Sequence, residues 1–188
     1  STVEAVASQV FIPLTVGGGV SKLQDIERLL EKGADKVSIN TSAILDPSLV
    51  GNAAKKFGSQ CIVVAVDSKR EGEKSYVYTH GGKNKTAFET SAWIKIVEGE
   101  GAGEILLTSM DRDGTKIGFD NELTSSIAKD LSIPLITSGG AGCIDHMIEG
   151  ITDGKADAVL AASIFHQKEI TIAEVKDGLA SKGIEVRL

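Results

Sequence analysis

The chain has 188 residues, of which 41% are hydrophobic, 24% are charged and 21 are glycines, a balance that favours one α/β domain with an aliphatic core and many tight turns. The formal net charge of -6 argues against a broad nucleic-acid or anionic-membrane surface, although it permits a small anion site built from backbone N–H groups. No apolar stretch approaches the roughly 20 residues of a membrane span and no signal peptide is visible, so the sequence predicts a cytoplasmic protein.

The first residues place apolar side chains at a helical spacing, which we interpret as the end of a helix whose beginning is missing. From Ile12 onward, short apolar runs alternate with turns and with amphipathic stretches of roughly ten to fifteen residues. The runs are Pro13–Val16, Lys36–Ile39, Cys61–Val66, Glu104–Thr108, Pro134–Thr137 and Ala158–Ala161. Most are apolar at consecutive positions, which predicts parallel strands buried on both faces.

An alternating stretch interrupts this order after the third run. Ser75–Lys83 alternates polar and apolar residues and contains the pair Gly81-Gly82. This pattern predicts a hairpin or mobile flap on the loop that follows Asp67. Such lids exclude water from a reaction.

The chain also contains an internal repeat. Pro13–Val20 aligns with Pro134–Ala141, Gly33–Val37 aligns with Gly154–Val159 with one insertion, and Gly101–Ile105 is a weaker third copy. In each copy the glycine is expected to end a helix in a left-handed conformation. The aligned segments lie four strands apart, as in an eightfold barrel assembled from two similar halves.

We therefore predict a TIM (β/α)₈ barrel, with residues 1–188 forming a single domain. The alternative is an open doubly wound sheet, which more often carries one glycine-rich loop after its first strand. Here two strands of the repeat are followed by such loops, which favours the barrel.

Both glycine-rich loops are candidate phosphate sites. Glycines let a ligand approach the backbone and point N–H groups at an anion. Small polar residues after the next run of each copy are expected to add donors. The first site would contain Gly18, Gly19, Asn40 and Thr41, and the second Ser138, Gly139, Gly140, Ala162 and Ser163. The alternative role for Asn40 and Ser163 is helix N-capping. Two anion sites half a ring apart predict a ligand phosphorylated at both ends.

The carboxylates at strand ends are the candidate chemical groups. Asp67 ends an otherwise apolar strand at the barrel mouth and is predicted to be catalytic. Thr108 ends the next strand, Asp113 and Gly114 follow it, and all three are predicted to contact substrate. The alternative for Asp111 and Asp113 is a role as Asx-turn residues, and Asp111 is the weaker candidate.

Cysteines and histidines receive no chemical role. Cys61 and Cys143 lack a second Cys or His at metal-ligand spacing, so we expect reduced thiols and neither a metal nor a cofactor. His80, His146 and His166 are scattered and are expected to be surface or packing residues.

Taken in order, these motifs resemble the cyclase subunit of imidazole glycerol phosphate synthase, an enzyme of histidine biosynthesis. The matching segments, which span essentially the whole chain, are Thr15–Gly19, Gly33–Thr41, Val63–Arg70, Gly101–Thr115 and Ser138–Gly142. The resemblance implies a barrel that takes ammonia from a glutaminase partner. It also implies a substrate that is a ribulosyl aminoimidazole carboxamide nucleotide with a phosphate at each end, converted to imidazole glycerol phosphate and aminoimidazole carboxamide ribotide.

The resemblance also assigns individual residues. Asp67 matches one of the family's two acid–base aspartates, while Lys36 and Glu104 match charged residues where ammonia enters the barrel. The alternative for Lys36 and Glu104 is a solvated strand-end pair. The second catalytic aspartate of the family lies on its first strand, which has no match here, so the six units correspond to strands three to eight. We expect such an incomplete barrel to self-associate through its open edges and to have little or no activity alone.

Two other functions remain open. The sister isomerase of the same pathway also has paired phosphate sites and an Arg-Asp-Gly-Thr segment. Lys36–Thr41 and Asp67–Arg70 favour the cyclase. The third possibility is a non-catalytic barrel fragment that binds phosphorylated ligands.

Overall fold

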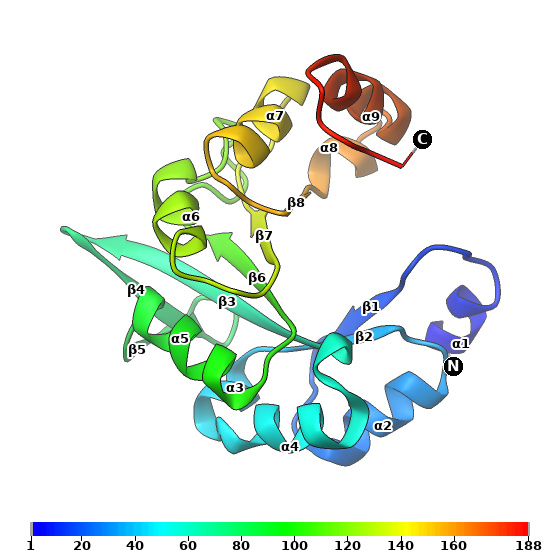
Figure 1. Ribbon diagram of the computed structural model, residues 1–188, viewed down its shortest axis with the longest axis vertical. Coiled ribbons are helices and arrows are strands. Elements are labelled where there is room, and N and C mark those ends of the chain that lie inside the picture. The colour runs from blue at the N-terminus through cyan, green and yellow to red at the C-terminus, as the bar shows by residue number, and fades with distance from the viewer. Residues whose placement is uncertain (1, 188) are drawn as a thin grey trace. The chain divides into compact units, whose positions relative to one another are not determined.

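The computed structural model describes residues 2–187 (Figure 1). The helices are α1 (Thr2–Ala7), α2 (Leu23–Glu31), α3 (Thr41–Leu45), α4 (Ser48–Phe57), α5 (Thr90–Glu100), α6 (Asn121–Ala128), α7 (Ile144–Thr152), α8 (Ser163–His166) and α9 (Ile172–Ser181). The strands are β1 (Thr15–Gly17), β2 (Lys36–Ile39), β3 (Ile62–Glu71), β4 (Lys74–Thr79), β5 (Asn84–Glu89), β6 (Glu104–Ser109), β7 (Leu135–Ser138) and β8 (Ala158–Leu160).

All six predicted runs form strands of one sheet, in the order β1-β2-β3-β6-β7-β8. The pairs β1–β2, β2–β3 and β7–β8 are parallel, and helices separate the successive strands of this path. Sequence neighbours are thus sheet neighbours, as right-handed β-α crossovers produce. The fold class is an incomplete α/β TIM barrel, as predicted.

The third strand differs from its predicted bounds. It continues to Glu71, so Asp67 lies inside β3 and not at its end, as the sequence had suggested. The reason is that β3 also pairs with β4, which extends the strand beyond the barrel register. The predicted hairpin is confirmed as β4 and β5, which pair antiparallel. Its turn contains His80, Gly81 and Gly82, all with positive φ.

The chain forms two compact units, and the first contains residues 1–66 and 76–105. Helix α4 packs against α2 and α5, and Figure 1 shows these three helices in a row along one side of the first strands. Strand β2 buries Val37 and Ile39 completely, whereas Lys36 and Ser38 on its other face are half-buried. The prediction of strands buried on both faces is therefore wrong for β2, because only the face that carries Val37 and Ile39 is fully covered.

The second unit contains residues 67–75 and 106–188. Its core consists of Phe119, Met147, Ile164, Val175 and Leu179, contributed by the segment before α6 and by α7, α8 and α9. Strand β8 is mostly exposed, like β1, and each has a single sheet neighbour among the described strands.

The repeat is reproduced in three dimensions. Helices α2 and α7 each have nine residues and start at aligned positions. The registers also correspond, because Val16 pairs with Val37 as Thr137 pairs with Val159. One detail was predicted wrongly: Gly33 and Gly101 have positive φ after their helices, but in the second copy Lys155 does so instead of Gly154. Gly154 is instead closely packed, since a Cβ there would lie 2.5 Å from the Gly150 carbonyl oxygen.

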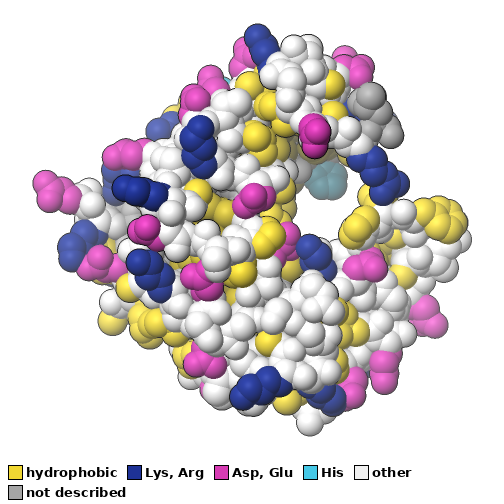
Figure 2. Space-filling view, in the orientation of Figure 1, with side chains coloured by type: hydrophobic (Ala, Val, Ile, Leu, Met, Phe, Trp, Pro, Cys, Tyr) yellow, Lys and Arg dark blue, Asp and Glu magenta, His cyan; other side chains and the backbone are white. Residues whose placement is uncertain are grey.

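No helix in residues 2–187 is long and apolar enough to cross a membrane. Acidic and basic side chains are interspersed over the face drawn in Figure 2 and do not gather by sign. Both Cys61 and Cys143 are free thiols.

Candidate functional site

The same pair of hydrogen bonds anchors the strand before each glycine loop. The Asp35 carboxylate accepts the Leu14 N–H at 2.7 Å, and the Asp35 N–H donates to the Leu14 carbonyl. In the second copy, Asp157 makes both bonds with Leu135. Each aspartate thus fixes the start of one strand to the start of the next, and both glycine loops leave the sheet from equivalent places.

The helix after each glycine loop is also tied back to it, but by different chemistry. The Asp25 carboxylate accepts both the N–H and the hydroxyl of Ser21 at 3.1 Å. The Ser21 backbone bond is the main reason that the pKa of Asp25 lies below its ordinary value. At the aligned position of the second copy, His146 Nδ1 accepts the Gly142 N–H at 3.1 Å. His146 therefore holds a loop, a role that its isolated position in the sequence did not suggest.

The first glycine loop is open. Gly18 and Gly19 have φ of +97° and +69°, and a Cβ at either would meet no atom within 4 Å. The next loop lies beside it, because the Ser42 hydroxyl donates to the Val20 carbonyl at 2.6 Å. Asn40 precedes α3, but its side chain makes no capping hydrogen bond to the helix. Asn40 therefore occupies the N-cap position of α3, as the alternative supposed, but does not cap the helix through its side chain.

The hairpin turn contacts this first site. The N–H of His80 donates to the Thr41 hydroxyl oxygen at 3.1 Å. The His80 ring in turn lies 3.0 Å from the Thr79 hydroxyl oxygen and 3.3 Å from the Asn84 amide nitrogen. The turn of the flap is thus placed beside a predicted phosphate-binding residue.

The second glycine loop borders a pocket of about 160 Å³. Its lining includes residues from three consecutive loops of the second unit, namely Asp113, Gly114 and Lys116, then Ser138, Gly139, Gly140 and Ala141, then Leu160, Ala161, Ala162 and Ser163. All predicted residues of the second phosphate site therefore meet at one concavity, together with two of the predicted substrate contacts. Ser163 is the first residue of α8 and Ala162 is its N-cap, so the N-capping alternative is wrong for Ser163.

The glycines of the second loop are needed for packing, unlike those of the first. A Cβ at Gly139 would lie 2.7 Å from the Ser109 carbonyl oxygen, and one at Gly140 would lie 2.2 Å from the Gly118 carbonyl oxygen. The Gly118 N–H also donates to the Gly140 carbonyl at 2.8 Å. The loop between β6 and α6 thus rests directly on the second glycine loop.

Two predicted residues lie on strands and outside that pocket. Asp67 is half-buried, on the same face of β3 as Ala65. Thr108 is half-buried on β6 and does not line the pocket around Gly140. Because side chains of a strand alternate between its two faces, the place of each residue in its strand is enough to explain why it is half-buried.

Lys36 and Glu104, separated by 68 positions in sequence, form an ion pair. Lys36 Nζ lies 2.9 Å from Glu104 Oε2, and their side chains are 32% and 15% exposed. Each residue is the first of its strand, at the end opposite the glycine loops. The pair is thus partly shielded from water, which distinguishes it from a freely solvated strand-end pair.

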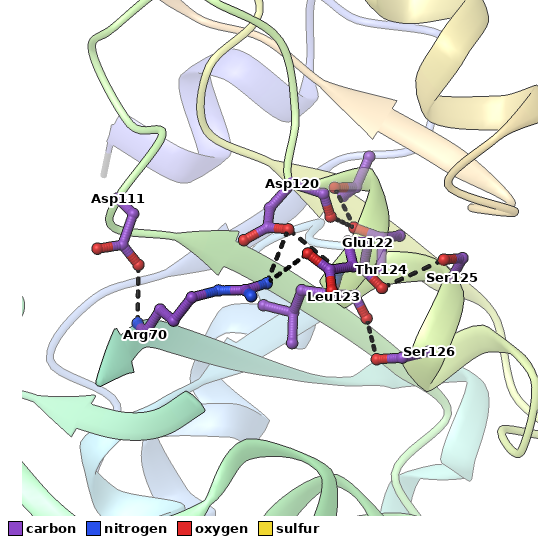
Figure 3. Close-up of polar contacts among 9 residues, drawn as sticks. Arg70, Asp111, Asp120, Glu122, Leu123, Thr124, Ser125 and Ser126 are labelled. Atoms are coloured by element: carbon purple, nitrogen blue, oxygen red, sulfur yellow. Dashed lines mark hydrogen bonds and ion pairs between the residues drawn. The ribbon is translucent and has the colours of Figure 1, made fainter. Parts of the chain in front are cut away.

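An arginine that the sequence did not single out organises the loop after β6 (Figure 3). The Arg70 N–H donates to the Asp111 carboxylate at 2.8 Å, and its guanidinium lies 3.1 Å from Glu122 Oε2 and 3.7 Å from Asp120 Oδ1. Asp120 is buried and accepts the Leu123 N–H as the N-cap of α6. Asp111 is therefore an anchor for the loop that carries Asp113.

Lys116 is the other residue that sequence reasoning missed. It lines the pocket at the second glycine loop and has φ of +57°, a backbone conformation that residues other than glycine rarely adopt. Its position after Asp-Gly-Thr carries no local signal for that backbone conformation.

Within residues 2–187, no three His, Cys, Asp or Glu side chains come together as a metal site would require. The second glycine loop offers backbone amides, hydroxyls and a lysine around one small pocket, which is chemistry suited to phosphate. A family model described as histidine biosynthesis protein matches residues 1–171. The chain therefore belongs to the histidine biosynthesis protein family, whose members are barrel enzymes of that pathway.

Proposed function

We propose that this chain is the cyclase-type member of the family. It would use ammonia to convert a bis-phosphorylated ribulosyl aminoimidazole carboxamide nucleotide to imidazole glycerol phosphate and aminoimidazole carboxamide ribotide. The observation that carries the proposal is the repeated glycine loop, which has two consecutive positive-φ glycines at aligned positions in each copy. One loop for each phosphate matches a substrate that carries two.

Each loop has neighbours that suit a phosphate. Around Gly139 and Gly140, the hydroxyls of Ser138 and Ser163 line the same pocket. Near Gly18 and Gly19, the open space above the glycines leaves room for an anion to approach the backbone. Backbone N–H groups and hydroxyls are donors without a full charge, so they hold phosphate without neutralising neighbouring carboxylates.

Asp67 is the proposed acid–base group. Ring closure with ammonia requires one group to accept a proton and another to donate one. This chain would contribute Asp67 as one of the two.

The pair Lys36 and Glu104 supports the cyclase over the isomerase. Ammonia must reach the substrate, and a partly shielded ion pair at the far end of the strands suits a gate that ammonia passes. A glutaminase partner that supplies ammonia would dock at that end. The isomerase has no need for such a passage.

Turnover separates the alternatives. The protein is assayed for ammonia-dependent cyclisation and for the isomerase reaction, with ammonium salt as the nitrogen source. The cyclase proposal requires the first activity, its loss in Asp67→Asn, and retained phosphate binding in that variant. Isomerase activity alone would establish the sister enzyme, and phosphate binding with neither activity would establish a non-catalytic binder.

A further inference from the structure

The pocket at the second glycine loop contains one cation, Lys116, which is paired with a carboxylate outside the pocket. Among its lining residues, Lys116 is the only basic side chain and Asp113 the only acidic one. Lys116 Nζ lies 2.5 Å from Glu169 Oε1 and 3.3 Å from Gln167 Oε1, on the segment after α8. The ammonium is thus held at the edge of the pocket by a carboxylate that does not itself line it.

The backbone of Lys116 has an unusual conformation and packs against the second glycine loop. Its φ of +57° is unfavourable for a residue with a Cβ, whereas glycine adopts it freely. A Cβ at Gly142 would lie 2.5 Å from the Lys116 carbonyl oxygen, so Lys116 is packed against the second glycine loop.

The ion pair with Glu169 is easily broken. The two side chains are 39% and 38% exposed, and half-exposed pairs of this kind stabilise a fold only slightly. A phosphate monoester carries about -1.5 to -2 charges near pH 7 and three acceptor oxygens, against one charge for a carboxylate. Lysine is a point charge on a flexible stem, which suits a change of partner.

We propose that Lys116 is a phosphate ligand of the second site. Glu169 binds the Lys116 ammonium when no phosphate is present. When a phosphate occupies the pocket beside Gly139 and Gly140, the ammonium leaves Glu169 for the phosphate oxygens. Glu169 therefore competes with the ligand, and the segment from Gln167 to Glu169 is released from Lys116 when the ligand binds. This inference rests on the proposed function, since it assumes that the pocket takes a phosphate.

Titration with inorganic phosphate tests the exchange, followed by the amide NMR shifts of Gly139 and Gly140. Lys116→Gln should weaken binding about tenfold, which corresponds to the loss of one charge-assisted contact. Glu169→Gln should tighten binding roughly threefold, because the competitor is gone. Lys116→Arg should bind within about threefold of the wild type. Lys116→Gly keeps the backbone conformation and should weaken binding as Lys116→Gln does.

The pair Lys56 and Glu27 provides the matched control, because it is similarly exposed, with Nζ and Oε1 2.8 Å apart, and lies in the other unit. Lys56→Gln and Glu27→Gln should leave phosphate affinity unchanged. Unchanged affinity in Lys116→Gln, or weaker binding in Glu169→Gln, would overturn the exchange while leaving the proposed function intact. Absence of any phosphate-induced shift at Gly139 and Gly140 in the wild type would overturn both.

Discussion

The two glycine loops of the repeat should respond very differently to the same substitution. Gly19→Ala places a methyl group in open space at φ of +69°, so its cost is the left-handed backbone alone, about 1–2 kcal/mol. Gly140→Ala has φ of +104° and also drives the methyl group to 2.2 Å from the Gly118 carbonyl oxygen. Overpacking of this kind adds about 1–3 kcal/mol, because the clash is with backbone that cannot rotate away.

The measurement is thermal unfolding of both variants, followed by far-UV circular dichroism. For a chain of this size, a difference of about 1–3 kcal/mol corresponds to roughly 2–12 °C in Tm, with Gly140→Ala the lower. Gly72→Ala serves as a control, because it has φ of +63° and no atom near the added Cβ, and should behave like Gly19→Ala. Equal losses in Gly19→Ala and Gly140→Ala would refute the conclusion that the loop after β6 rests on the second glycine loop.

Three further predictions concern charge and association. Lys36→Met should lower the free energy of unfolding in urea by about 1–2 kcal/mol, because it leaves the partly shielded Glu104 without its cation. Lys56→Met, at a more exposed pair, should lower it by roughly 0–0.5 kcal/mol. Similar losses in the two variants would contradict this difference. The pKa of Glu174 lies below its ordinary 4.5 because the carboxylate accepts the backbone N–H and then the hydroxyl of the N-cap threonine of α9. Its stabilisation is therefore present above pH 4.5 and lost as the pH falls below that value, and Glu174→Gln should show a smaller drop in Tm between pH 6 and pH 3.5 than the wild type. The chain should self-associate through the region of β1, where Phe11 is 94% exposed, and a light-scattering mass of one chain with cooperative unfolding would exclude this.

Strand positions were predictable where the signal is local. Lys36–Ile39 matches β2 at both ends, because an apolar run between Gly-Ala-Asp and Asn-Thr leaves little choice of boundary. The extension of β3 to Glu71 was not predictable, because all residues of Ser68–Glu71 are polar. It becomes a strand through pairing with β4, a tertiary interaction that no short window contains.

The glycine loops of the candidate site and several residues that line its pocket were predictable, whereas the contacts between distant side chains were not. The internal repeat located both glycine loops, because consecutive glycines at aligned positions are easily recognised in a sequence. By contrast, the exchange partners of Lys116 and the anchor between Arg70 and Asp111 join residues that are distant in sequence. Capping roles failed for a different reason: Asn40 and Ser163 are suitable residue types, but one makes no cap bond and the other lies a position too late.

The differences between the two copies of the repeat indicate how the protein would bind its proposed substrate in one orientation. Two identical loops would bind either phosphate of the proposed substrate equally well, because an anion meets the same amides in each. The loops differ in what surrounds them: Gly19 faces open space, whereas Gly140 lies under the segment that carries Lys116 and Asp113. A positive and a negative side chain at one phosphate site, with no counterpart among the predicted residues of the other, can distinguish the groups attached to that phosphate. We therefore expect the glycines to determine whether a phosphate binds, and Lys116 and Asp113 to determine which end of the substrate binds at the second loop.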